Sequence, residues 1–321
     1  SAASDVYKRQ PYISSVPSQA IVFCEQNGFP LFTIPWKTRI IDISYEFCRR
    51  IIANEKREST IADAFRGIIR NPATADDYSS MLNRAGFYDD SSYTVISLSI
   101  LRKSISITES VVRTTDMSLW RMLKKSGNHS SLFMKEGDLV AVRQNCSEEE
   151  IVMFCELLRP IAEQSADTEI YIGVSESVRG FAEISQAYEQ SYAAMLTGRI
   201  KGKEHVFYRD IGLMKLIFGV KDKMILSSFA EENLGVLHRY DSEKNTDYCS
   251  VLRKYLELNG SVLEAAAETG VHRNTINYKI RAIREILGRE LDDHTKSMLM
   301  LAYLIEDVLD IYDNLNGGNK Q

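Results

Sequence analysis

The chain has 321 residues, of which 44% are hydrophobic and 26% are charged, and its formal net charge is −5. These values predict a soluble globular protein of roughly two domains with about 150 residues each. No apolar run reaches the roughly 18 residues that cross a bilayer, and no cleavable leader is recognisable, so we expect a cytoplasmic protein without a membrane partner.

The N-terminal segment has too few elements for a complete domain. Residues 1–10 lack a starting Met and an apolar period, so we interpret them as a non-native scar and exclude them from the fold. Residues 17–27 predict a short helix, and residues 31–34 predict one buried strand. Because a single strand has no partner for its backbone groups, we interpret residues 11–58 as the last part of a larger domain.

Two helical stretches follow the strand. The apolar spacing predicts one helix at 40–52 and a second helix at about 59–69. We assign residues 59–87 to a helical linker.

Short strands alternate with helices between residues 88 and 210. The patterns predict strands at 93–100, 169–174 and 205–208, a hairpin at 131–143, and helices at 116–125, 148–165 and 181–199. This layout predicts an α+β domain in which helices pack on one mostly antiparallel sheet.

The last third of the chain has no strand pattern and is expected to be helical. We divide it into a connector at 211–243, a helical unit at 244–312 and a tail at 313–321. Within the unit, Ser261 and Glu264 form a capping box that begins a helix, and Gly270 ends it. The next helix begins within about three residues, so the pair predicts a helix-turn-helix.

The second helix of this pair has one apolar face and one polar face. Ile276, Ile280, Ile283 and Leu287 are spaced 4, 3 and 4 residues apart, which predicts a buried stripe. Asn and Arg side chains can read base edges, while Arg, Lys, Tyr and Thr bind phosphate oxygens. The expected DNA-binding residues are His272, Arg273, Asn274, Thr275, Asn277, Tyr278, Lys279, Arg281 and Arg284. The other interpretation of the same pattern is a solvated basic face.

The final helix, at about 293–312, carries a second apolar stripe formed by Leu299, Ala302, Ile305, Val308 and Leu309. We expect this stripe to pack on the helix-turn-helix. A broader surface with Met298, Met300, Leu301 and Leu304 leaves a dimer contact open as a second use.

The run HRNTINYKI at 272–280 resembles a core motif of the C-terminal DNA-binding domain of PucR/CdaR-type bacterial transcriptional regulators. Residues 173–196 resemble the GGDEF-like middle domain of that family, and residues 27–52 resemble the end of its N-terminal sensory domain. The resemblance implies a ferredoxin-like palm followed by an all-α domain. It also implies a regulator that binds operator DNA under the control of a small-molecule effector, whose identity the sequence does not give.

The middle domain could instead be an enzyme. A diguanylate cyclase of the GGDEF fold needs two carboxylates beside its hairpin turn to hold metal. Here Gly137 and Asp138 match part of that motif, but Leu139 and Val140 follow, where Glu and Phe would stand. We expect a hairpin turn without catalysis, because Gly and Asp favour such turns. The alternative is a nucleotide-binding or diguanylate-cyclase-like enzyme, and a protein-binding scaffold is a third possibility.

Other chemistry-bearing residues show no catalytic or metal-ligand spacing. The five cysteines are odd in number and form no C-x-x-C pair, which predicts buried, reduced thiols. The five histidines are isolated, and only His272 has a sharper interpretation, as a phosphate contact or as the cap of the helix turn. We therefore expect no catalytic residue, no metal and no cofactor. A single recognition helix covers only a few base pairs, so we expect a homodimer or higher homo-oligomer on DNA.

Overall fold

The computed structural model describes residues 5–8, 16–27, 31–34, 38–102, 129–163 and 168–317, and the chain divides into two compact units, residues 1–61 and 62–321. In the first unit, strand β1 (Asp5–Lys8) pairs in parallel with strand β2 (Leu31–Ile34). The prediction that the strand at 31–34 has no partner is therefore wrong. Helix α1 (Ser18–Gln26) lies in the connection, and parallel strands need a crossover of this kind.

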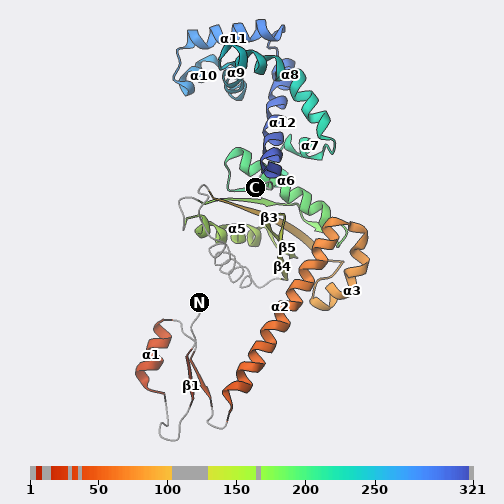
Figure 1. The fold of residues 1–321 in the computed structure, drawn as a ribbon, viewed down its shortest axis with the longest axis vertical. Coiled ribbons are helices and arrows are strands. Elements are labelled where there is room, and N and C mark those ends of the chain that lie inside the picture. The colour runs from red at the N-terminus through yellow and green to blue at the C-terminus, as the bar shows by residue number, and fades with distance from the viewer. Residues whose placement is uncertain are drawn as a thin grey trace. The chain divides into compact units, whose positions relative to one another are not determined.

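Helix α2 (Ile40–Arg70) is one continuous helix of 31 residues (Figure 1). The prediction of two separate helices is wrong, because the polar stretch between them contains neither Gly nor Pro and consists mostly of good helix formers. Ion pairs from Glu46 to Arg49 and Arg50 further stabilise the first half of the helix.

Within its described residues, the second unit contains a sheet of six strands in the order β4-β5-β3-β6-β8, with β7 paired to β3. Its strands are β3 (Ser92–Arg102), β4 (Ser130–Lys135), β5 (Asp138–Gln144), β6 (Thr168–Val174), β7 (Val178–Arg179) and β8 (His205–Phe207). Every pairing is antiparallel except that of β6 with β8. The predicted mostly antiparallel sheet is confirmed. The helix expected at 116–125 lies outside the described residues.

Helices cover both faces of this sheet. Ile96 and Leu98 of β3 pack in one core with Ile151 and Phe154 of α5 (Glu148–Glu163). On the opposite face, the Ser97 hydroxyl lies 2.7 Å from the Ser191 hydroxyl of α6 (Ile184–Lys201). The sheet is preceded by a 3-10 turn (Pro72–Thr74) and α3 (Ala75–Ala85).

The C-terminal part is entirely helical. A 3-10 turn (Tyr208–Asp210) leads into α7 (Met214–Gly219), α8 (Lys223–Lys244), α9 (Tyr248–Glu257), α10 (Val262–Thr269), α11 (Arg273–Leu287) and α12 (Asp293–Gly317). One core lies between the five helices α8, α9, α10, α11 and α12, around Leu252 and Ile283. A second core lies between α6, α7, α8 and α12, around Leu226 and Val308. Helices α8 and α12 therefore contribute to both cores.

Two further expectations concern cysteines and membranes. Cys24 and Cys155 are buried free thiols, as predicted, but Cys48 is exposed on α2, because it lies on a helix face that no described element covers. Within the described ranges, no helix combines the length and apolar character that crossing a membrane requires.

Candidate nucleic-acid interface

Helices α10 and α11 form the predicted pair with a tight turn. The Ser261 hydroxyl accepts a hydrogen bond from the Glu264 amide at 3.3 Å, which caps α10. The Ser261 amide donates to the Leu258 carbonyl at 3.0 Å, so the backbone satisfies the donor that a full capping box assigns to Glu264. Gly270 ends the helix with φ +67°, a conformation that favours glycine.

The side chain of His272 caps the N-terminus of α11. Its Nδ1 accepts a hydrogen bond from the amide of Asn274 at 3.2 Å. Of the two roles expected for His272, the structure shows the cap. Asn, Asp, Ser and Thr are the usual N-cap residues of helices. At the start of α11 the side chain of His272 takes this role.

One face of α11 is anchored in the core of the helical domain. Ile276 and Ile283 are fully buried, Ile280 is nearly so, and Leu287 packs at the edge of the same cluster. The predicted buried stripe is confirmed. Ala265 of α10 is also buried in this core, which lets α10 approach closely, whereas Ala267 is exposed.

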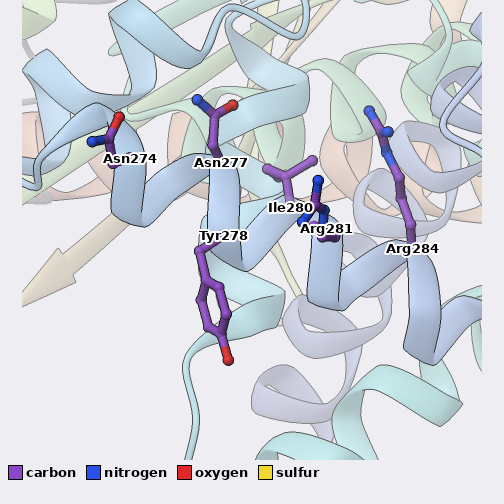
Figure 2. Close-up of a pocket in the computed structure, with 6 residues that line it drawn as sticks. All are labelled: Asn274, Asn277, Tyr278, Ile280, Arg281 and Arg284. Atoms are coloured by element: carbon purple, nitrogen blue, oxygen red, sulfur yellow. The ribbon is translucent and has the colours of Figure 1, made fainter.

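The polar face of α11 borders a surface hollow of about 530 Å³, lined by Asn274, Asn277, Tyr278, Ile280, Arg281 and Arg284. Figure 2 shows Asn277 and Arg284 projecting to the same side of the helix, while Tyr278 points to the other side. Tyr278 is 69% exposed, so its hydroxyl is available to a ligand. Arg273, Asn274, Thr275, Asn277 and Arg281 are likewise exposed.

The basic residues of this region fall into two groups. Arg273 and Arg281 have no ion-pair partner among the described residues, and Arg284 makes one long contact, 3.5 Å, with exposed Glu290. By contrast, both carboxylate oxygens of Asp247 lie 2.6 Å from the Lys279 ammonium. Arg289 donates to the backbone and side-chain oxygens of Asn233.

Lys279 is therefore ion-paired within the helical domain, and its assignment as a DNA contact stays a prediction. Its side chain is only 20% exposed and ties α11 to the start of α9. Sequence patterns give no signal for this pair, because Asp247 lies 32 residues away in the chain.

The hairpin of the middle domain forms a two-residue turn. Glu136 and Gly137 have φ values of +55° and +95°, and Lys135 pairs with Asp138 across the strands. Positive φ at both central residues is the geometry of a type I′ turn, which is favoured in two-residue hairpins. Burial raises the pKa of the Asp138 carboxyl, while a hydrogen bond with Ser99 opposes that shift. Within the described part of the chain, no group of three or more His, Cys, Asp or Glu side chains is arranged to hold a metal ion.

A further arrangement escaped the sequence patterns because it joins three helices. The Nε2 of His238 lies 2.8 Å from Glu306, and its Nδ1 lies 3.4 Å from the Cys249 sulfur. A carboxylate, an imidazole and a thiol in this order would suit nucleophilic catalysis. However, burial raises the pKa of the Cys249 thiol to about 12, which keeps it protonated and unreactive. The contacts instead connect α8, α9 and α12.

The chain is similar to known families in two regions. Residues 248–305 match the PucR C-terminal helix-turn-helix domain, and residues 70–195 match the GGDEF-like domain. These matches confirm the predicted resemblance and the predicted fold, an α+β GGDEF-like domain followed by a helical helix-turn-helix domain. The assignment of residues 11–58 to a PucR-type sensory domain stays a prediction, as do the domain boundaries.

Two relatives from Bacillus subtilis are transcriptional activators. The chain is 25% identical over 146 residues to the proline-responsive transcriptional activator PutR, covering 44% of this chain and 36% of PutR. It is 22% identical over 111 residues to the DNA-binding transcriptional activator AdeR, covering 34% of this chain and 26% of AdeR. The chain thus matches well under half the length of either protein.

Among solved structures, a regulator of polyketide synthase expression from Bifidobacterium adolescentis is similar at 19% identity, covering 77% of this chain and 97% of that chain. Its TM-score is 0.36, which supports no conclusion on the arrangement of domains.

Proposed function

We propose that this chain, a PucR-type transcriptional regulator by its GGDEF-like and helix-turn-helix domains, binds a specific operator sequence in double-stranded DNA through α11. The observation that carries the proposal is the exposed face of α11. Asn277 and Arg281 stand on it, one face of the helix is anchored by buried isoleucines, and the adjoining surface is hollowed. A helix held rigidly with free amide and guanidinium groups suits a major groove.

We assign base reading to Asn274, Asn277 and Arg281. The assigned phosphate contacts are Arg273, Thr275, Tyr278 and Arg284, which flank this set and carry hydrogen-bond donors. His272 acts on the DNA contact indirectly, by holding the first turn of α11. Lys279 takes no phosphate in this assignment, since Asp247 already holds its charge.

The test begins with selection of binding sites from a random library of double-stranded DNA by the full chain. A selected consensus, and binding at least about 10³-fold tighter to it than to unrelated DNA, is expected for a specific regulator. Recovery of random sequences, with affinity that depends only on salt, would contradict specific recognition and leave a solvated basic face.

We further propose that two copies act on two half-sites, separated by about 10 base pairs or a multiple of that spacing. One recognition helix reads too few base pairs to select an operator from a genome. The C-terminal helix is a poor candidate for the contact between copies, because Leu301, Leu304 and Leu309 pack into the core of their own chain. We therefore place the contact between the two copies outside α12.

The middle domain is proposed to serve signalling or dimerisation and not catalysis. At the hairpin, Leu139 and Val140 replace a metal-binding carboxylate and its neighbour. Incubation of the purified chain with GTP and magnesium should yield no cyclic dinucleotide. Turnover that disappears in Asp138→Ala would establish the enzymatic alternative.

The signal is proposed to be a small metabolite that acts from the cytoplasm, where chromosomal DNA lies. PutR is named as proline-responsive, which supports a metabolite as the class of effector without fixing its identity. Thermal unfolding of the protein against a panel of amino acids and purines would test this class, because a ligand that binds the folded state raises the midpoint.

A further inference from the structure

The first half of α2 carries large apolar side chains that no described element covers. Six of them, each between 45% and 71% exposed, lie within residues 40–52: Ile40, Ile41, Tyr45, Phe47, Ile51 and Ile52. Exposed apolar side chains scattered singly need no explanation, but a contiguous apolar face on one helix marks an interaction surface. We call this face the α2 stripe.

The α2 stripe follows a seven-residue repeat. If Ile41 is placed at position a of a heptad, Cys48 occupies the next a position, while Ser44 and Ile51 occupy the d positions. The flanking e and g positions then hold the other exposed apolar residues, Ile40, Tyr45, Phe47 and Ile52. All six therefore face one partner helix in a coiled coil, because a, d, e and g line its seam.

The charged side chains lie outside this seam. Asp42, Glu46, Arg49 and Arg50 occupy b, c and f positions, and Glu46 pairs with Arg49 at 3.1 Å and with Arg50 at 3.0 Å. These ion pairs hold Glu46, Arg49 and Arg50 on the outer surface of α2, and Asp42 lies 3.9 Å from Arg39. The first charge on the seam itself is Glu55, at the next a position, so the apolar seam ends after Ile52.

We propose that residues 40–52 of α2 pair in parallel with the same residues of a second copy of this chain. The seam is self-complementary in that arrangement, because each g residue meets the e residue five positions later on the other copy. Ile40 then contacts Tyr45, and Phe47 contacts Ile52, on both sides of the two-fold axis. The inference rests on the proposed function in that two copies act on one operator, and the parallel direction sets Ile41 opposite Ile41 and Ile51 opposite Ile51 of the second copy.

The two possible directions place Cys48 differently. In the parallel pair, Cys48 lies opposite Cys48 of the second copy, whereas an antiparallel pair of the same stretch sets it opposite Ser44. Cys48 is an exposed free thiol, while Cys24 and Cys155 are buried. A short bismaleimide added to the full chain should therefore cross-link two copies, and Cys48→Ser should abolish the product.

A pair of matched substitutions tests the seam itself. Ile51→Glu puts a charge at position d, where it would be buried, and Ala53→Glu puts the same charge two residues away at the outer f position. The dimer of the full chain should weaken by at least about tenfold in Ile51→Glu and stay unchanged in Ala53→Glu, measured by sedimentation without DNA.

The outcomes separate this inference from the proposed function. A monomeric wild type, or a dimer equally stable in Ile51→Glu, would overturn the pairing. The parallel register would be overturned if Ile51→Glu dissociates the dimer but the bismaleimide forms no cross-link through Cys48. Binding of one isolated half-site, measured in the same variants, reports on α11 alone. A chain that forms the cross-linked dimer but does not bind DNA would therefore contradict the proposed function and not the pairing.

Discussion

The ammonium group of Lys279 lies 2.6 Å from both carboxylate oxygens of Asp247, so the recognition helix carries one of its positive charges already neutralised. The pair joins α11 to the N-terminus of α9. Because Lys279 is largely covered while Arg273 and Arg281 are exposed, the charge offered to DNA is smaller than the sequence of α11 indicates.

Asp247→Asn should therefore strengthen binding to any DNA sequence. The substitution frees Lys279 for a phosphate, and one more phosphate contact steepens the dependence of log affinity on log salt by about 0.9. Fluorescence anisotropy with random and selected duplexes across a salt series measures this. Glu183→Gln changes the net charge equally on an exposed site of the middle domain and is the control. Equal gains in both variants would show that only overall charge matters.

Asp138→Asn should stabilise the chain at neutral pH. Burial raises the pKa of this carboxyl above its ordinary value of 3.8, so folding disfavours its charged form. The carboxyl contributes stability that is present at low pH and lost as the pH rises through its folded pKa. The advantage of the amide should shrink as the pH falls towards 3.8. Urea unfolding across this range gives the difference, and an advantage that does not change with pH would contradict the assignment.

Gly173→Ala should destabilise the middle domain. A Cβ added at this position of β6 would overlap the carbonyl oxygen of Ser191 and the amide nitrogen of Met195 in α6. These are backbone atoms of a buried helix, so the sheet and α6 must separate, at a cost of about 1 to 3 kcal/mol or more. Gly219→Ala is the matched control, since an added Cβ there meets no atom within 4 Å. Similar unfolding midpoints for the two variants would argue against the close packing.

Local patterns predict this fold well where neighbours in sequence decide the structure. The buried stripe through Ile276 and Ile283 and the turn at Gly270 follow from helical spacing and glycine backbone freedom alone. Patterns fail where the partner is remote in sequence, as for Asp247 beside Lys279. They also fail for the break expected within α2. A polar stretch has the composition of a linker, but in the structure it continues the helix.

His272→Ala should weaken the first turn of α11, whereas His272→Asn should preserve it. The Nδ1 of His272 accepts from the Asn274 amide, and an Asn side chain can cap the same donor. Loss of such a cap costs about 0.5 to 2 kcal/mol. Unfolding by urea should therefore rank the wild type and His272→Asn together, above His272→Ala. If both variants lose DNA affinity equally while stability is unchanged, the ring itself contacts the phosphate backbone.

Replacing Asn277 or Arg281 with Ala should reduce specificity, whereas replacing Arg284 should not. Asn277 and Arg281 can each form two hydrogen bonds to one base edge, so each loss should cost about 1 to 3 kcal/mol on the selected operator and little on random DNA. Arg284 is assigned to a phosphate, so Arg284→Ala should weaken binding to both duplexes alike and lower the salt slope by about one. Anisotropy titrations of the three variants against both duplexes give the six affinities. Equal losses on operator and random DNA for all three would remove the basis for assigning base contacts to this face of α11.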